Sequence, residues 1–345
     1  MNCAKGCVVP PPNAKRFMFK KWLPIALKFL ISGALIWYLF DRNHHAIDDA
    51  LVSVRDIDTD MLALAVLMMF GQVIVCGLRW QAVLIALGEP LSLAKSTLLF
   101  YIGSFFSQTL PSSVGGDAVR MYKGRRAGLS LSAAINSVML ERGATVVALV
   151  ILVMATQPVF LSRVSDEMGD WMMLILTILT VGLVGGLAFT MVLDRLPESL
   201  RRWRLVKGLA YLATDTRRVF LKPGPFVRSV GWGLVGHVNI AMFVYLLVLG
   251  MKIDATLVDC LALVPLVLLA TTLPISIAGW GVRETAMVVA FGAVGVPEAN
   301  SLALSIVIGL ISIVTSLPGG ILWLVTRESV PPADEIQPSV GDIGR

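Results

Sequence analysis

Long runs of apolar residues, separated by short polar connections, dominate the chain between residues 22 and 325. Six runs are long enough to cross a hydrocarbon core of about 30 Å as helices; they cover residues 22–40, 61–87, 131–156, 171–193, 228–250 and 301–325. Two further segments, 96–110 and 257–273, would reach only about 22 Å and about 25 Å. The pattern predicts an all-α, polytopic transmembrane helix bundle with about six full spans among eight hydrophobic segments.

Each shorter segment runs into one copy of a repeated sequence: "TLPSSVGGDAVR" at 109–120 and "TLPISIAGWGVR" at 272–283, with seven of twelve positions identical. Proline ends or kinks a helix, and glycine loosens it further. We therefore expect helix breaks at Pro111 and Pro274. Interrupted hydrophobic segments at matching places in two halves are typical of transporters built from repeats.

The distribution of Lys and Arg predicts how these elements sit in the membrane. Residues 1–21, 118–130 and 194–228 hold five, four and nine basic residues, whereas residues 41–60 hold two. Basic connections stay in the cytoplasm, and 118–130 would lie outside if 96–110 crossed fully. We therefore expect the first copy to be re-entrant from the cytoplasm. After three crossings the second copy enters from outside and returns over 283–296, which makes an inverted repeat.

The same pattern predicts three regions. Residues 1–21 form a basic cytoplasmic tail, residues 22–325 the transmembrane domain, and residues 326–345 a disordered cytoplasmic tail. The expected location is the bacterial inner (plasma) membrane, with both termini in the cytoplasm.

Composition supports the membrane assignment, because 56% of the residues are hydrophobic and only 15% are charged, against about 25% in soluble domains. The net charge of +6 does not indicate nucleic-acid binding, since the basic residues adjoin apolar spans. The pair Cys3 and Cys7 has no second pair or histidine cluster to complete a metal site. We expect no metal, no cofactor and no nucleotide site, because no GxxxxGK[ST] sequence is present.

Charged residues within apolar segments identify a candidate substrate site, because a charge at the bilayer centre costs about 2.5–3.5 kcal/mol and needs a partner or a wet cavity. Arginines and loosened helix starts together favour anions, and in a membrane the evident anion is a lipid phosphate. The candidates are three arginines, three acids that hold them and four glycines: Arg120, Arg142, Arg283, Asp117, Glu141, Glu284, Gly115, Gly116, Gly279 and Gly281. The alternative is a set of internal ion pairs that only fix helix positions.

Several of these residues carry their own expectation. Asp117 and Arg120 are three apart and share a helix face. Glu141 and Arg142 are neighbours, so one should meet the first repeat and the other a second partner or water. Glu284, near a helix start, is favourable with the helix dipole. Arg79 should extend to the interface, while His237 and Asn239 should form interhelical hydrogen bonds.

The run "RW…LLFYIGSFFSQTLPSSVGGDAVRMYKGRRAG…SVMLERG", with the later "LPISIAGWGVRETA", resembles the lysylphosphatidylglycerol synthase transmembrane region, a flippase-like family also called UPF0104. The resemblance covers roughly residues 20–325. It implies a membrane region that moves modified phospholipid between leaflets. The resemblance also implies that the family's motif positions correspond to the following residues of this chain: Pro111, Gly115, Gly116, Asp117, Arg120, Glu141, Arg142, Pro274, Gly279, Gly281, Arg283 and Glu284.

Two departures qualify the resemblance. Ala278 stands where the family often has glycine. In the multiple peptide resistance factor a similar region is joined to a cytoplasmic aminoacyl-transfer domain, which we do not expect here, so lysyl transfer is not the expected activity.

Three functions remain open. The first is a flippase for an anionic phospholipid, a glycolipid or a polyprenyl-phosphate-linked sugar, with one midplane site exposed alternately to each side. The second is a membrane-embedded transferase, for which Glu141 and Asp117 would be the acid–base candidates. The third is a membrane partner of a separate glycosyltransferase or synthase, docked on the basic 194–228 segment.

Overall fold

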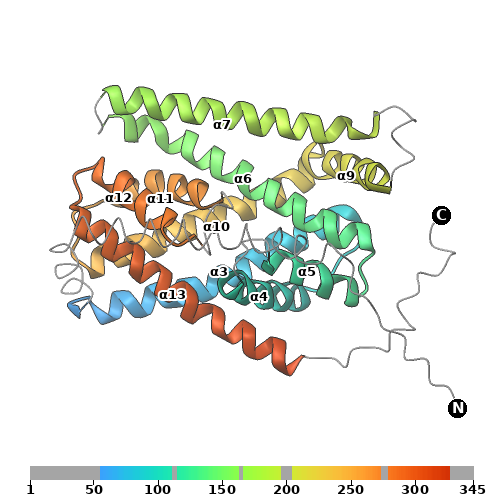
Figure 1. Cartoon of the computed structure of the whole chain (residues 1–345), viewed down its shortest axis with the longest axis horizontal. Coiled ribbons are helices and arrows are strands. Elements are labelled where there is room, and N and C mark those ends of the chain that lie inside the picture. The colour runs from blue at the N-terminus through green and yellow to red at the C-terminus, as the bar shows by residue number, and fades with distance from the viewer. Residues whose placement is uncertain (1–54, 111–114, 163–165, 196–203, 273–278, 327–345) are drawn as a thin grey trace, which may run out of the picture.

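The computed structural model describes residues 55–110, 115–162, 166–195, 204–272 and 279–326, and this part of the chain is helical, without strands (Figure 1). The fold class predicted from the hydrophobic pattern is confirmed. In chain order the helices are α3 (Thr59–Leu87), α4 (Leu93–Thr109), α5 (Gly115–Arg126), α6 (Leu131–Leu161), α7 (Asp166–Val192), the 3-10 turn η1 (Leu193–Arg195), α9 (Arg204–Phe220), α10 (Pro223–Gly250), α11 (Leu257–Thr272), α12 (Val282–Gly292) and α13 (Glu298–Val325).

Five helices are long and apolar enough to cross a membrane: α3, α6, α7, α10 and α13. They correspond to five of the six predicted spans. The sixth, at 22–40, lies outside the described residues, as do the 1–21 tail, residues 327–345 and the two predicted break positions Pro111 and Pro274. The helices before those prolines end at Thr109 and Thr272.

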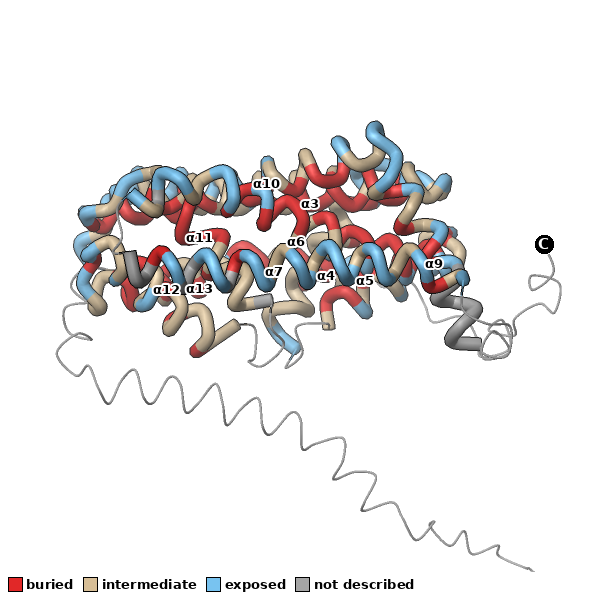
Figure 2. The backbone as a smooth tube through the Cα atoms, turned by 90° about the horizontal axis from the view of Figure 1, so that it is seen from above, coloured by how far each residue is buried: buried red, intermediate tan, exposed pale blue. Residues whose placement is uncertain are grey.

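Helices α3 and α10 form an antiparallel pair along one side of the bundle (Figure 2). The amide of Asp58, the N-cap of α3, donates to the carbonyl of Gly250 at the end of α10 over 2.9 Å. Halfway along, the Asn239 side-chain amide donates to Gln72 Oε1 at 2.9 Å. The C-terminal ends of α3 and α10 therefore lie at opposite ends of the pair.

Each of these two helices is followed by a helical hairpin. Helices α4 and α5 pack against each other to form the first hairpin, and α11 and α12 form the second. The ends of the first hairpin meet, because the Glu89 carboxylate accepts from the Ser130 amide at 2.7 Å and from its hydroxyl at 2.5 Å. Since α3 and α10 are antiparallel, the hairpins start from opposite ends of the bundle, and both views place them so (Figures 1 and 2).

The two halves of the chain match element by element. The starts of α3 and α10, and of α4 and α11, lie 164 residues apart. The starts of α5 and α12, and of α6 and α13, lie 167 apart. Backbone details repeat as well: Gly88 and Lys252 both have positive φ after the first helix of each half, and Gly128 and Gly295 do so after each hairpin.

The second helix of each hairpin starts at a different point of the repeated sequence, a shift that the sequence repeat alone does not reveal. The connection inside the first hairpin is residues 110–114, and the one inside the second is 273–281, four residues longer. Four residues are about one helical turn. Arg120 and Arg283, which occupy the same position in the repeated sequence, therefore lie at the sixth residue of α5 and the second residue of α12.

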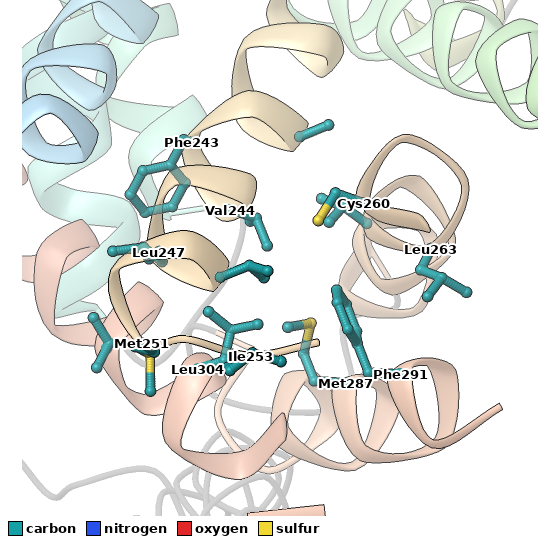
Figure 3. Packing of buried hydrophobic residues seen from close by; sticks show 14 of the residues in the cluster. Phe243, Val244, Leu247, Met251, Ile253, Cys260, Leu263, Met287, Phe291 and Leu304 are labelled. Carbon is teal, nitrogen blue, oxygen red and sulfur yellow. The ribbon is translucent and has the colours of Figure 1, made fainter. Parts of the chain in front are cut away.

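The largest apolar core lies in the second half of the bundle. Figure 3 shows Phe243 and Leu247 of α10 and Met251 directly after it, together with Cys260 and Leu263 of α11; Met287, Phe291 and Leu304 of α12 and α13 complete the cluster. In lipid this packing acts through van der Waals contact rather than through exclusion of water. It fixes the base of the second hairpin against its flanking spans.

Helix α7 lies at the edge of the bundle (Figure 1), and most of its described residues are exposed or half-buried (Figure 2). Its exposed apolar residues include Ile178, Val181 and Phe189. Beside its end lies α9, a helix within the basic segment 194–228 that hydropathy did not predict. Arg217 on α9 donates to both carboxylate oxygens of Asp194, at 3.0 and 2.5 Å. This hydrogen bonding raises the pKa of the Arg217 guanidinium and ties α9 to the end of α7.

Candidate functional site

A network of five charged residues, four of them buried, joins the first hairpin to the neighbouring spans. We call it the first charge cluster, and it consists of Arg79, Asp117, Arg120, Glu141 and Arg142. Glu141 of α6 accepts from Arg79 Nε of α3 at 2.6 Å and from Arg120 Nη1 of α5 at 3.1 Å. Asp117 Oδ1 lies 3.3 Å from Arg120 Nη1. Three guanidinium groups share two carboxylates, so the cluster has a formal charge of +1.

Arg120 is the most enclosed member of the first hairpin. Arg120 is 3% exposed. Its guanidinium carbon lies 4.6 Å from the ring centroid of Trp80 and 4.5 Å from that of Phe100. Such cation–π contacts stabilise a charge where water is absent. Nε and Nη2 of Arg120 have no hydrogen-bond partner among the described residues, so this guanidinium retains donor capacity.

Close approach of α4 and α5 allows Arg120 to reach this position. A Cβ atom on Gly103 would lie 2.6 Å from Arg120 Cγ, and one on Gly116 would lie 2.2 Å from the Gly103 carbonyl oxygen and 2.0 Å from Ser107 Oγ. Gly116 therefore serves helix packing within the hairpin. Gly115 faces Leu110, whose side chain a Cβ would meet at 2.7 Å.

We expected Arg79 to extend to the membrane interface, and this prediction is wrong. Its residue is 7% exposed, and it pairs with Glu141 and approaches Cys76 Sγ to 3.8 Å through Nη2. The reason is the position of α6, which brings a buried carboxylate beside this turn of α3. Hydropathy of a single helix carries no information about such a neighbour.

Glu141 and Arg142 both contact α5, whereas we expected only one of them to meet the first repeat. Glu141 reaches Arg120, and Arg142 donates to Asp117 through Nε at 3.0 Å and Nη2 at 3.2 Å. They can do so because Asp117 and Arg120 lie nearly one turn apart on the same face of α5, as predicted. The side chain of Glu141 is 1% exposed and that of Arg142 is 55% exposed, so Arg142 presents the cluster's charge to the outside.

A second charge cluster lies at the start of α12 and consists of Arg283, Glu284 and Ser305. Arg283 Nη2 donates to Glu284 Oε1 at 2.7 Å, and Arg283 Nε lies 3.2 Å from Ser305 Oγ on α13. The guanidinium carbon lies 4.8 Å from the Trp280 ring centroid. The formal charge of the second charge cluster is zero. No ion pair joins it to the first charge cluster among the described residues, so Arg283 and Glu284 are not brought together with Arg120 and Arg142.

Glycine conformation shapes the start of α12. Gly279 and Gly281 have φ of +83° and +86°, values that L side chains rarely adopt. The Gly281 amide donates to Glu284 Oε2 at 2.5 Å. Glu284 thus accepts from an otherwise free amide at the helix start, which agrees with the expected structural role.

One cavity lies between the two halves of the bundle, and a second lies within the second half. The first cavity, about 130 Å³, lies among α3, α4 and α13 and is lined by Met69, Gln72, Val73, Cys76, Phe100, Ser104, Gln108, Ser312, Thr315 and Ser316. The second cavity, about 170 Å³, is lined mainly by apolar residues of α10, α11 and α13 and is bordered by Gly279 and Arg283. Met69 and Ser312 line both cavities, which are therefore neighbours.

The first cavity adjoins the first charge cluster. Phe100 lines the cavity and contacts Arg120, and Cys76 lines it and contacts Arg79.

The sequence did not predict the roles of Trp80, Phe100, Ser305 and the cavity residues of α13, because aromatic and hydroxyl residues inside apolar spans cannot be told from ordinary packing residues. His237 and Asn239 make the interhelical bonds expected of them, to Thr145 and to Gln72 with Met68.

The part of the chain that the structure describes contains no group of three or more His, Cys, Asp and Glu residues arranged to hold a metal ion. The acidic residues of both clusters are instead engaged by arginines.

Long apolar helices, two opposed helical hairpins and a buried arginine–carboxylate network define a polytopic integral membrane protein with an internal inverted repeat. The profile of the family described as "Lysylphosphatidylglycerol synthase TM region" matches residues 25–319, and the chain belongs to this family. Membership relates it to membrane proteins of lipid handling. No curated protein sequence matches the chain.

Proposed function

We propose that the protein translocates an anionic lipid or a lipid-linked sugar between the leaflets of the bacterial inner membrane, with the basic connections on the cytoplasmic side. The observation that carries the proposal is the first charge cluster. Its three arginines exceed its two carboxylates, two nitrogens of Arg120 have no partner among the residues that the structure describes, and a cavity adjoins it. A buried guanidinium with unused donor nitrogens beside a cavity favours a phosphate.

The inverted repeat supports transport over chemistry. Two hairpins that start from opposite ends of one bundle can expose a shared site to each side in turn. Arg283, which borders the second cavity, would offer a separate contact for the anion after the site has opened toward the second hairpin. In this proposal Gly279 and Gly281 shape the site's backbone, Asp117, Glu141 and Glu284 hold its arginines, and Gly115 and Gly116 position the first hairpin.

The test is movement of fluorescent phosphatidylglycerol between leaflets of liposomes that contain purified protein. Arg142→Gln removes the most exposed charge of the first cluster while leaving its buried pairs in place. We expect the rate to fall at least about tenfold, the loss of roughly 1.4 kcal/mol of interaction. Arg228→Gln is the control, because Arg228 is an exposed arginine near the start of α10.

Wild-type protein that moves lipid no faster than protein-free liposomes would contradict the function. Equal rates for wild type and Arg142→Gln would instead contradict the role of the first charge cluster. Mass spectrometry of total lipid from cells with and without the gene separates transport from a transferase activity: transport leaves the lipid inventory unchanged.

A further inference from the structure

We propose that the outer face of α9, together with Lys222 just before α10, binds anionic phospholipids of the cytoplasmic leaflet. We call this face the α9 surface, and it consists of Tyr211, Thr214, Arg218, Leu221 and Lys222. Lipid bound there holds the end of α7 against the bundle. None of these residues lines the first or the second cavity, so the inference does not depend on the proposed function.

Helix α9 lies at the level where the membrane spans around it begin or end (Figure 1). Val219 belongs to an apolar cluster with the end of α3. Asp215 accepts from Asn136, near the start of α6, at 2.8 Å. Arg217 donates to the carbonyl of Met191, at the end of α7, at 2.5 Å. Because span ends mark the boundary of the hydrocarbon core, α9 lies in the head-group layer, and its basic residues place that layer in the cytoplasmic leaflet.

The two faces of α9 differ in character. The inner face is buried against the bundle and carries Leu212, Ala213, Thr216 and Val219. The outer residues recur every three or four positions and are exposed. Tyr211 and Leu221, each 63% exposed, lie on either side of Arg218 in the sequence. Large apolar side chains beside basic ones are typical of a helix that lies in the membrane surface.

The charge at this end of the bundle attracts anions. Residues 193–195 and 204–228 hold seven Lys and Arg against two acids, a formal excess of +5. One of the acids, Asp215, lies 3.4 Å from Arg218, which is long for a charge-assisted hydrogen bond. The Arg218 side chain is 50% exposed, and Lys222, four residues further on, is exposed as well. Both side chains are therefore accessible to a lipid phosphate.

Helix α9 also anchors the end of α7. Arg217, the neighbour of Arg218, donates to the Met191 carbonyl and to both carboxylate oxygens of Asp194. A ligand that binds one arrangement of a protein stabilises that arrangement. Anionic lipid at Arg218 therefore favours the position of α9 in which Arg217 stays bonded to the end of α7.

The test compares hydrogen–deuterium exchange of the purified full chain in two kinds of nanodisc, one of phosphatidylcholine alone and one that also contains phosphatidylglycerol. We expect phosphatidylglycerol to slow amide exchange at 190–195 and 204–222. The expected factor is about tenfold, which corresponds to anionic lipid at about ten times its dissociation constant. Equal exchange in the two kinds of nanodisc overturns the inference.

The double variant Arg218→Gln with Lys222→Gln removes two charges from the α9 surface. It should lose most of the protection by phosphatidylglycerol. Its exchange in phosphatidylcholine alone should stay near that of the wild type, because the exposed pair of Arg218 with Asp215 contributes little to stability. The matched control is Arg228→Gln with Lys95→Gln, since both residues are exposed at the same end of the bundle and lie outside the α9 surface. The control should keep the protection.

Protection that survives in the double variant, or that the control loses to the same extent, overturns the inference. A double variant that exchanges faster in both kinds of nanodisc, and is still protected by phosphatidylglycerol, overturns it too, since the two residues then only position α9.

Lys222→Gln alone repeats the test if the double variant does not fold, because Lys222 is an exposed residue before the first turn of α10. We expect this variant to lose part of the protection, and unchanged protection overturns the inference. Liposomes in which the protein moves no lipid contradict the proposed function and leave the α9 surface standing.

Discussion

Glu141 is the residue on which the first charge cluster depends, because its carboxylate lies between two buried guanidinium groups. It is 1% exposed and bonds to Arg79 on one side and Arg120 on the other. Such a network contributes little more to folding stability than an apolar core of the same volume would, but removing one member leaves buried charges without a partner. The cluster therefore fixes the relative positions of α3, α5 and α6.

Replacing Glu141 by glutamine should destabilise the protein by about 3–5 kcal/mol, since two arginines then lose their counter-charge in a dry site. The measurement is the thermal unfolding midpoint in detergent. Asp60→Asn is the control: this exposed carboxylate lies in the first turn of α3, where its interaction with the helix dipole amounts to about 0.3–1 kcal/mol. Equal shifts for the two variants would show that the cluster does not order the helices.

The candidate residues of the first hairpin could be predicted from sequence because charge in an apolar span is conspicuous. The sequence contains Asp117, Arg120, Glu141 and Arg142 at helical spacings that limit which can meet. It does not contain the distance between α3 and α6, which decides that Arg79 joins them. The pairing of Arg283 with its own neighbour Glu284, rather than with the first cluster, likewise depends on tertiary positions.

At the scale of the element, the first hairpin depends on contact between two glycines, Gly103 of α4 and Gly116 of α5. Gly116→Ala would bring a methyl group to 2.2 Å from the Gly103 carbonyl oxygen, and the helices would have to move apart. We expect a destabilisation of about 1–3 kcal/mol, measured by thermal unfolding. Gly182→Ala in α7 is the control, because nothing lies within 4 Å of its added Cβ and alanine favours helix by about 1 kcal/mol.

The ends of the first hairpin are tied by Glu89. Glu89→Ala removes the acceptor of both the Ser130 amide and its hydroxyl, so residues 127–131 should exchange amide hydrogens faster. Hydrogen–deuterium exchange with mass spectrometry measures this, with Ser162→Ala, an exposed hydroxyl just after the other end of α6, as the control. Unchanged exchange at 127–131 in the Glu89 variant would show that other contacts close the hairpin.

The helix breaks could be predicted from Pro, Gly and the shortness of the segments, whereas their register could not. The repeated sequences align Arg120 with Arg283, but the second connection is four residues longer. Gly279 and Gly281 in this connection have positive φ, which only glycine adopts readily. Helix α9 was missed for another reason: it is amphipathic and basic, so a search for long apolar runs passes over it.

At the scale of the whole molecule, the opposed orientation of the two hairpins depends on the antiparallel pair α3 and α10, since this pair puts the bases of the hairpins at opposite ends. The hydrogen bond from Asp58 to Gly250 and the meeting of Glu89 with Ser130 mark those two ends. In a membrane, one base would face the cytoplasm and the other the outside. Without that opposition, no single site between the hairpins could be opened to each side in turn.

Single cysteines at the two bases test this opposition most directly. In a background with Cys3, Cys7, Cys76 and Cys260 replaced by alanine, Ser132→Cys and Asp254→Cys place one exposed thiol beside each hairpin. A membrane-impermeant maleimide applied to spheroplasts should label Asp254→Cys and leave Ser132→Cys unlabelled, and inverted vesicles should give the reverse. Labelling of both thiols from the same side would contradict the inverted repeat and the transport proposal that rests on it.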